Sequence, residues 1–200
     1  GDYYDRTFND WSNTFTNCDF MDMMNGKNRG YATGVVDPRR AFWFLPSSEP
    51  ATAGNSDWDG YPFDYTSDTK TGIITAHGGN KSYARLNMYE QNGFFHYSGK
   101  GNENLSWCYS SYSEALFLKA EAALRGWISG NAEDLWKQAI KASMDEVATF
   151  VTRSGGDKTI SAAEKDAYIA ALPSFGSNKE DQLRSIMIQK WIALYPNSVE

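Results

Sequence analysis

The second half of the chain contains four segments in which a helix start signal precedes an apolar stripe, and this pattern constrains the fold most. In the clearest segment, Ser111 and Glu114 form a capping box, in which each side chain satisfies an otherwise unpaired amide. The following residues end at Gly126, a residue type that favours the left-handed conformation in which helices stop. Because the segment is apolar on nearly every side, we expect a central, buried helix over 111–125.

Three further segments place apolar residues at helical spacing behind a capping residue. The acids after Asn131 suit the positive first turn of a helix, and Pro196 ends the last segment because proline cannot continue a helix. The capping residues are Asn131, Ser161 with Glu164, and Ser177 with Glu180, and the expected helices cover 131–151, 161–171 and 178–195. Short connections between these helices favour antiparallel pairs.

The pair 111–125 and 131–151 is typical of a tetratricopeptide-like hairpin, although a longer turn at 127–130 interrupts the repeat of about 34 residues. Packing alone supports a helical hairpin and no more. We expect Leu118 and Trp136 to share one core there, so that truncating either would cost roughly 2–5 kcal/mol.

The first half differs in composition, since residues 1–110 hold 21 of the 30 aromatic residues and 12 of the 17 glycines. It offers one good helix, at 16–25, and the aromatic run 41–45 between prolines predicts a short strand. Residues 46–81 are rich in Gly, Ser, Asp and Asn and are typical of a loop. We therefore expect a mainly α fold with long irregular loops and little strand. Residues 1–110 would form a loop-rich segment and 111–200 a helical segment of one domain.

Composition excludes several classes of function. The net charge is −6 and no basic stripe follows the chain, which argues against nucleic acid as a partner. A mean hydropathy of −0.57 and the lack of a long apolar run argue against a membrane span. Cys18 and Cys108 are too few for a four-ligand zinc site, and the sequence leaves open whether they pair. No cofactor is indicated.

No catalytic or metal-binding motif is complete. The run His77-Gly78-Gly79 is similar to an oxyanion loop, but the chain has no Gly-x-Ser-x-Gly nucleophile to use it, so we interpret His77 as a loop residue. The spacing of Asn55, Asp57 and Asp59 imitates the start of a calcium-binding EF-hand loop. Its twelfth position is Thr66, where a bidentate glutamate is needed, so an Asx-rich turn is the better interpretation.

The best candidate for ligand contact is the run Asp57-Trp58-Asp59-Gly60-Tyr61, because it combines aromatic rings with acids in a loop without packing periodicity. Sugar rings stack on aromatic faces through their C–H groups, and carboxylates accept hydrogen bonds from hydroxyls. Tyr65 and Trp43 are secondary candidates. The competing interpretation is that these aromatic residues pack beneath the loop, and Trp58 must be at least partly exposed to refute it.

Four segments, in their order along the chain, correspond to landmarks of one known family. They are Asp37-Pro38-Arg39, Tyr83-Ala84-Arg85-Leu86-Asn87, the helical segment 113–126, and the segment 181–197 with the ending Gln189-Lys190-Trp191-Ile192-Ala193-Leu194. Together they resemble the SusD/RagB family of nutrient-binding surface lipoproteins of the Bacteroidota. The resemblance spans residues 16–197 and corresponds to the C-terminal part of a family member, so we expect this chain to be part of a longer protein.

The resemblance implies a non-catalytic protein that captures glycan or peptide nutrients at the cell surface. It also implies an outer-membrane location, with a lipid anchor on a segment not present in this chain, and a SusC-like TonB-dependent transporter as partner. Two alternatives come from other classes of protein. One is a glycoside hydrolase, which would turn its substrate over, and the other is a helical scaffold that binds peptides.

Overall fold

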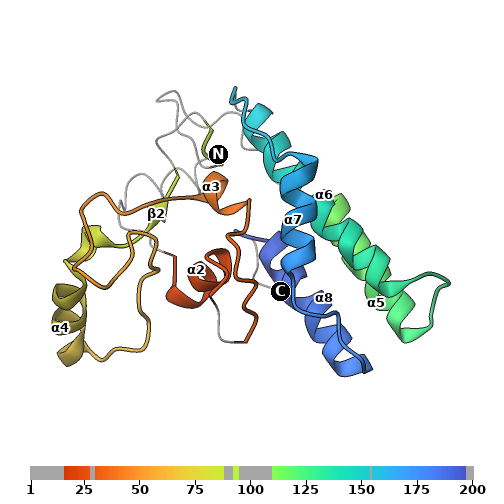
Figure 1. Ribbon diagram of the computed structural model, residues 1–200, viewed down its shortest axis with the longest axis horizontal. Helices are drawn as coiled ribbons and strands as arrows, with labels where there is room; N and C mark the ends of the chain where they lie inside the picture. Colours follow the sequence, from red (N-terminus) through yellow and green to blue (C-terminus); the bar gives the residue numbers. More distant parts are fainter. Residues whose placement is uncertain (1–15, 28–29, 88–91, 95–109, 154, 197–200) are drawn as a thin grey trace. The chain divides into compact units, whose positions relative to one another are not determined.

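The structure is a computed structural model, and it describes residues 16–27, 30–87, 92–94, 110–153 and 155–196 (Figure 1). Contacts along the chain divide it into two compact units. Unit 1 comprises Gly1–Leu105 together with Phe150–Lys158, and unit 2 comprises Ser106–Thr149 together with Thr159–Glu200. Each unit has its own set of buried apolar side chains.

Unit 1 begins with helix α2, Cys18–Met24, close to the expected 16–25. The side chain of Asn17 caps it by accepting a hydrogen bond from the amide of Phe20 at 2.8 Å. One face of α2 carries Phe20, Met21 and Met24, which are buried, and the Phe20 ring lies 6.0 Å from the ring of Phe44. Burial of this apolar face holds α2 in unit 1.

The aromatic run 41–45 is a strand over only part of its length, so the prediction of a strand across all of it was wrong. Helix α3, Arg40–Trp43, occupies the first part, and strand β1, Phe44–Leu45, follows it. Strand β1 pairs antiparallel with β2, Arg85–Leu86, with Phe44 opposite Leu86. The helical turn forms because the Asp37 side chain accepts the Arg39 amide at 2.9 Å, which starts a turn before the strand.

A second correction concerns residues 46–81, which contain a helix that was expected to be loop. Helix α4, Ser67–His77, begins at a capping box made by Thr66 and Thr69 and ends at Gly78, in the left-handed conformation. The short 3-10 helix η2, Asn80–Ser82, follows it. The segment 67–77 lacks an apolar stripe, with Ile74 as its buried residue, and this hid the helix in the sequence.

The helices expected from the capping signals are in unit 2, except that α6 continues into unit 1 from Phe150 onward. They are α5, Tyr112–Arg125; α6, Ala132–Arg153; α7, Ala162–Ala171; and α8, Lys179–Ala193. Asn131 accepts hydrogen bonds from two amides of the first turn of α6, and Ser161 with Glu164 forms the expected capping box of α7. The cap of α8 lies one residue later than expected, because Asn178 accepts the amide of Asp181 at 3.0 Å.

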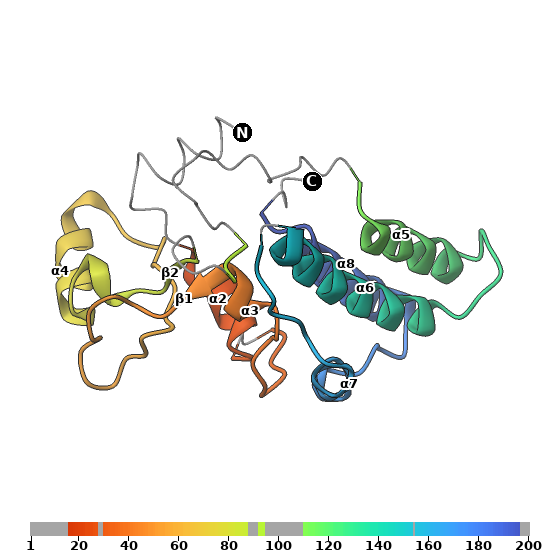
Figure 2. The ribbon, with the colours of Figure 1, turned by 90° about the horizontal axis from the view of Figure 1, so that it is seen from above.

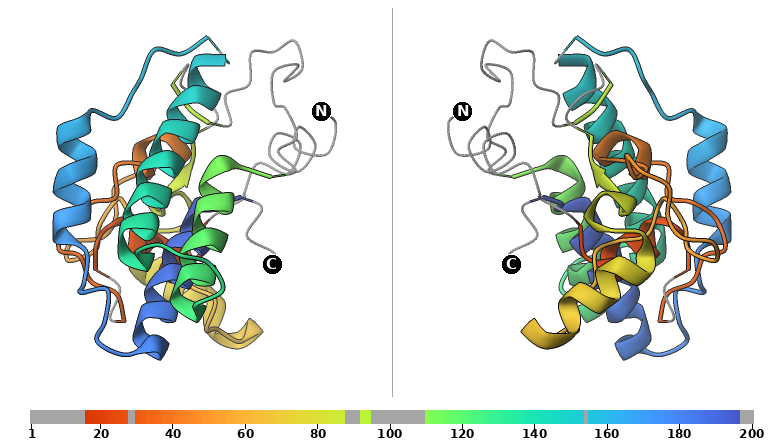
Figure 3. Two further views of the ribbon diagram at one scale, coloured as in Figure 1. Left: turned by 90° about the vertical axis from the view of Figure 1, so that its right-hand side faces the viewer. Right: turned by 90° about the vertical axis from the view of Figure 1, so that its left-hand side faces the viewer.

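Helices α5, α6 and α8 lie side by side in unit 2 (Figures 2 and 3). Trp136 of α6 is buried, with its ring 5.1 Å from the Phe175 ring, and its indole N–H donates to the carbonyl of Ser185 in α8 at 3.0 Å. Helix α7 joins this layer through a buried hydrogen bond from Gln189 of α8 to the Tyr168 hydroxyl at 3.1 Å. The prediction for Leu118 was wrong, since its side chain is 50% exposed while its neighbours Leu116 and Phe117 are buried.

The described part of the chain is therefore mostly helical, with a two-stranded sheet as its named β structure. This confirms the predicted mainly α fold class with little strand. None of the helices in that part is both long enough and apolar enough to cross a membrane.

Candidate functional site

The predicted ligand segment lies in a loop, residues 55–61, that is fastened to helix α2. The amide of Cys18 donates to the Tyr61 carbonyl at 3.0 Å, and the Tyr61 amide donates to the Thr16 carbonyl at 2.7 Å. Gly60 permits this approach, because a Cβ atom at that position would lie 2.5 Å from the carbonyl oxygen of Asn17. The loop backbone is thereby fixed at the start of α2.

Trp58 lies at the other end of α2 and is half-buried, as its candidacy requires. The Asn25 side chain donates to the Trp58 carbonyl at 2.9 Å and accepts a hydrogen bond from the Arg40 guanidinium at 2.6 Å. That guanidinium lies 3.7 Å from the centre of the Trp58 ring, a cation–π contact. Burial lowers the pKa of Arg40 below its ordinary value. The indole is therefore held in place on one face by a stacked cation.

Asp59 and Tyr61 meet at a row of aromatic rings that the sequence did not reveal. His77 Nε2 lies 3.0 Å from Asp59 Oδ2, and the His77 ring stacks on Tyr83 with 4.0 Å between the ring centres. Tyr83 contacts Tyr61 at 4.9 Å, and Tyr61 contacts Tyr65 edge-on at 6.3 Å. We call Tyr65, Tyr61, Tyr83 and His77 the aromatic row. It brings three of the predicted residues, Asp59, Tyr61 and Tyr65, into one neighbourhood.

The contacts of His77 resemble a catalytic triad in composition but not in accessibility. His77 Nδ1 lies 2.9 Å from the Ser82 hydroxyl oxygen. The side chains of Asp59, His77 and Ser82 are thus joined by two consecutive hydrogen bonds, with His77 in the middle. Ser82 is completely buried, however, and its hydroxyl donates to the Gly79 carbonyl at 2.7 Å. A nucleophile must reach its substrate, so this serine holds the end of helix α4 and does not attack a substrate. His77 is the last residue of α4, which corrects its interpretation as a loop residue.

A cleft of about 550 Å³ opens beside the aromatic row, within the size range of ligand sites. Its described lining is Cys18, Asp22, Asn55, Asp59, Gly60, Pro62, Ile73, Ala76, His77 and Tyr83. Burial raises the pKa of the Cys18 thiol, and the nearby carboxylates of Asp19 and Asp22 raise it further. Burial also raises the pKa of the Tyr83 hydroxyl, with smaller contributions from Tyr61, Asp59 and Cys18. Cys108, the other cysteine, lies outside the described residues.

The remaining predicted contacts differ in their accessibility. Asp57 is exposed, and its carboxylate accepts the Ala51 amide at 3.0 Å, which holds the preceding segment. Tyr65 is half-buried and lies under the ammonium group of Lys70. Trp43 is completely buried, next to Phe20, in the core of unit 1. A side chain with no exposed surface cannot stack on a sugar, so Trp43 is a packing residue.

In the segment whose spacing imitates an EF-hand, the side chains form hydrogen bonds with the backbone of the loop itself. Asp59 Oδ2 accepts the Ser56 amide at 2.9 Å, and the Ser56 hydroxyl accepts the Trp58 amide at 3.2 Å. These are the local side-chain to backbone bonds of an Asx-rich turn. Over the described residues, no group of three or more His, Cys, Asp or Glu side chains gathers as a metal site would require.

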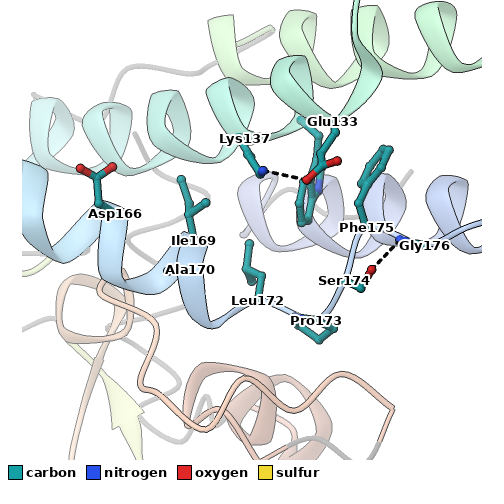
Figure 4. A pocket seen from close by; sticks show the side chains of 11 residues that line it. Glu133, Lys137, Asp166, Ile169, Ala170, Leu172, Pro173, Ser174, Phe175 and Gly176 are labelled. Atoms are coloured by element: carbon teal, nitrogen blue, oxygen red, sulfur yellow. Dashed lines mark hydrogen bonds and ion pairs between the residues drawn. The ribbon is translucent and has the colours of Figure 1, made fainter.

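A second pocket, of about 390 Å³, lies within unit 2 between α6, α7 and the segment 172–176 (Figure 4). Lys137 and Glu133 form an ion pair at its edge, 2.7 Å apart. Its two aromatic residues, Trp136 and Phe175, are 2% and 7% exposed and offer little surface for stacking. The unit 1 cleft is lined by the buried ring of Tyr83, and the partly exposed rings of Trp58, Tyr61 and Tyr65 lie outside its lining. The loop 55–61, with the partly exposed Trp58 and Asp59, is therefore the better match to a sugar.

Comparison with known proteins gives one family match. The family model described as "SusD-like_2: Starch-binding associating with outer membrane" matches residues 4–200, nearly the whole chain. No curated protein matches the chain.

Two solved structures share the fold. One, titled a chitin-binding protein, is 24% identical with a TM-score of 0.56, and the match covers 81% of this chain and 32% of that one. The other, titled BT1043, is 22% identical with a TM-score of 0.57, covering 98% of this chain and 37% of that one. The chain thus spans about a third of the length of either protein.

Proposed function

We propose that the protein captures glycans at the bacterial cell surface, because the chain belongs to the SusD-like family described as starch-binding and associating with the outer membrane. The observation that carries this proposal at the residue level is the loop 55–61. It presents the partly exposed indole of Trp58 and the carboxylate of Asp59, which is 30% exposed, on a backbone fixed to α2. Stacking surface and acceptor together are what a sugar requires.

In this proposal Trp58 stacks on a sugar ring, while Asp59 and Asp57 accept hydrogen bonds from hydroxyls. Tyr61 and Tyr65 extend the aromatic surface through the aromatic row. The protein holds its ligand without hydrolysing it, and a peptide ligand in place of a glycan is an alternative. It then delivers the ligand to a SusC-like TonB-dependent transporter, and a lipid anchor outside this chain keeps it on the outer membrane.

The first prediction tests this function with Trp58→Ala. Loss of a stacking ring should weaken binding of maltoheptaose by about tenfold, since 1.4 kcal/mol corresponds to one decade of affinity. The measurement is titration calorimetry on the chain, with circular dichroism to verify the fold.

Trp127→Ala is the matched control, because Trp127 is a 73% exposed tryptophan that belongs to unit 2 and is not part of the loop 55–61. It should leave the affinity unchanged. Equal affinities of the wild type and Trp58→Ala for every glycan that binds would refute the role of Trp58. Chromatography of the incubated maltoheptaose should show it intact, whereas shorter products would favour a glycoside hydrolase.

A further inference from the structure

We infer that Arg40, the arginine stacked on Trp58, binds an oxyanion carried by the glycan, either a carboxylate or a sulfate. This inference rests on the proposed function, since it specifies the class of glycan that the loop 55–61 would hold. Its evidence is the partly buried guanidinium of Arg40, which has no acid as partner among the described residues, and two unused donors along one edge of that group.

The first step is that no acid neutralises Arg40 in the part of the chain that the structure describes. Arg125 offers the comparison: its guanidinium lies 5.3 Å from the centre of the Trp127 ring, and it forms an ion pair with Glu121 at 2.6 Å. The guanidinium of Arg40 instead donates to a neutral group, the amide oxygen of Asn25, at 2.6 Å. Burial lowers the pKa of Arg40, and no described carboxylate raises it. Because a partly buried charge is costly without a partner, an anionic ligand would stabilise this one.

The second step concerns the edge of the guanidinium formed by Nε and Nη2. In Arg39 these two atoms bind one carboxylate, with Nε donating to Asp37 Oδ1 at 2.9 Å and Nη2 donating to Asp37 Oδ2 at 2.6 Å. In Arg40 neither atom donates to a described residue. Nε is buried without an acceptor, which is rare in folded proteins, whereas Nη2 retains exposed surface. An oxyanion that reaches Nη2 places its second oxygen toward Nε, in the fork geometry that arginine offers to carboxylates.

The third step is that the acids of the loop leave this edge free. The carboxylate of Asp57 accepts the Ala51 amide at 3.0 Å, and the carboxylate of Asp59 pairs with His77 at 3.0 Å. Among the described residues, neither acid forms an ion pair with Arg40. The loop therefore offers acceptors for sugar hydroxyls and, beside the Trp58 ring, a donor edge for an oxyanion.

Such a site favours acidic glycans over neutral ones of the same shape. The guanidinium covers one face of the Trp58 ring, so the stacked sugar uses the remaining surface, and the oxyanion comes from an adjoining unit of the same oligosaccharide. A neutral glycan gains the stacking alone, whereas an acidic one adds charge-assisted hydrogen bonds. The net charge of −6 repels acidic glycans at long range, so the preference depends on the local contact with Arg40.

The test measures two pairs of hexasaccharides on the whole 200-residue chain by titration calorimetry at neutral pH. One pair is the galacturonic acid hexamer and its methyl ester, which differ in the free carboxylates. The other is the κ-carrageenan hexasaccharide and its desulfated form, which differ in the sulfates. We expect the charged member of a pair to bind about fivefold more tightly, as one partly exposed charge pair allows, and this ratio to shrink at high salt. A preference in one pair alone assigns the site to carboxylates or to sulfates.

Arg40→Gln should bring the ratio close to one. Because the ratio compares two ligands on the same variant, any weakening of both through a displaced Trp58 cancels. Should Arg40→Gln lose its fold, as judged by circular dichroism, Arg40→Lys takes its place, since lysine keeps the charge but has no paired edge. Arg125→Gln is the matched control, because Arg125 also lies over a tryptophan ring but is paired with Glu121, and it should leave the ratio unchanged.

A ratio of one for both pairs in the wild type would overturn the oxyanion site and leave glycan capture standing. The same conclusion would follow if the substitution of Arg40 left the ratio unchanged, because the preference would then come from another cation. If neither these hexasaccharides nor maltoheptaose bind, both proposals fail.

Discussion

At the scale of single residues, a buried pair of charged side chains, Asp37 and Arg39, stabilises unit 1. Asp37 and Arg39 form an ion pair with no exposed surface on either side chain. Asp37 accepts the Arg39 guanidinium at 2.9 and 2.6 Å and the Arg39 amide at 2.9 Å, a bidentate arrangement with an added backbone bond. The Asp-Pro-Arg segment, noted in the sequence as a family landmark, is therefore a structural element that begins helix α3.

Asp37→Asn should destabilise the protein strongly. The substitution removes the negative charge that Asp37 places against the buried Arg39 guanidinium, and breaking a buried pair costs about 3–5 kcal/mol. Urea denaturation followed by circular dichroism measures the change in unfolding free energy. Glu49→Gln is the control, because Glu49 and Lys81 form a pair whose side chains are 54% and 70% exposed. A loss of stability no larger than that of the control would contradict the assigned role of Asp37.

At the scale of elements, the junction of loop 55–61 with α2 depends on the absence of a side chain at Gly60. Gly60→Ala should destabilise unit 1 by about 1–3 kcal/mol, the usual cost of forcing extra atoms into a packed site. The Cβ would lie 2.5 Å from the Asn17 carbonyl oxygen and 2.6 Å from the Cys18 Cα, both backbone atoms that cannot move alone. The readout is hydrogen exchange of the α2 amides, which should accelerate.

Gly72→Ala provides the matched control for this junction. Gly72 lies inside helix α4, and a Cβ there has no described atom within 4 Å. Alanine is the better helix former, so this substitution should stabilise the protein by about 0.5–1 kcal/mol. If both variants have the same stability as the wild type, the Gly60 contact is not a constraint.

The hairpin of α5 and α6 gives a second prediction for elements. Trp136→Ala should cost roughly 3–5 kcal/mol, because it removes a ring that is 2% exposed and a hydrogen bond to Ser185. Leu118→Ala should cost much less, about 1 kcal/mol or below, since half of that side chain is already in water. Denaturant midpoints of the two variants test this difference, and equal costs would contradict the packing described for α5.

The sequence predicted those elements whose signals are local. The helices of unit 2 begin where capping residues stand before an apolar stripe, so their positions were found to within a few residues. Helix α4 was missed because its capping box uses Thr69 in place of an acid and its surface is polar. Leu118 was misplaced because an all-round apolar helix does not say which side faces a neighbour.

Only the part of the candidate site that depends on residue type within one loop could be predicted from the sequence, because the rest depends on tertiary contacts. Trp58 and Asp59 were singled out from residue type and loop composition. The link from Asp59 to His77 joins residues 18 positions apart, and it depends on a helix that the sequence did not reveal. Asp22 and Tyr83 enter the cleft through the tertiary fold, and no local pattern marks them. The hydrophobicity of Trp43 could not distinguish a buried ring from a binding ring.

At the scale of the whole molecule, the chain crosses between its two units. Residues 150–158 belong to unit 1, although the sequence places them in the helical half. Phe150 contacts Phe94 with 5.1 Å between ring centres, and the Asn92 side chain accepts the amides of Asp157 and Lys158 at 2.8 and 3.0 Å. The division of the chain at residue 110 stays a prediction about sequence segments, whereas these contacts define the units.

The last prediction concerns the response of the molecule to alkaline pH. Burial raises the pKa of Cys18, Tyr61 and Tyr83, so the folded state favours their protonated, neutral forms. The stability they contribute is complete below their ordinary pKa values, about 8.5 for a thiol and about 10 for a phenol. As the pH rises through that range, the unfolded chain loses these protons first, so stability falls until the folded pKa values are passed.

We therefore expect the thermal unfolding midpoint of the whole chain to decline above about pH 9, and Cys18→Ala or Tyr83→Phe to make the decline shallower. Each substitution removes one group that must give up its proton in the unfolded state. Differential scanning calorimetry across this pH range measures the slope. Tyr112→Phe is the control, because Tyr112 is 68% exposed, and its slope should match the wild type. Identical slopes for all four proteins would mean that the buried thiol and phenol of unit 1 do not govern alkaline unfolding.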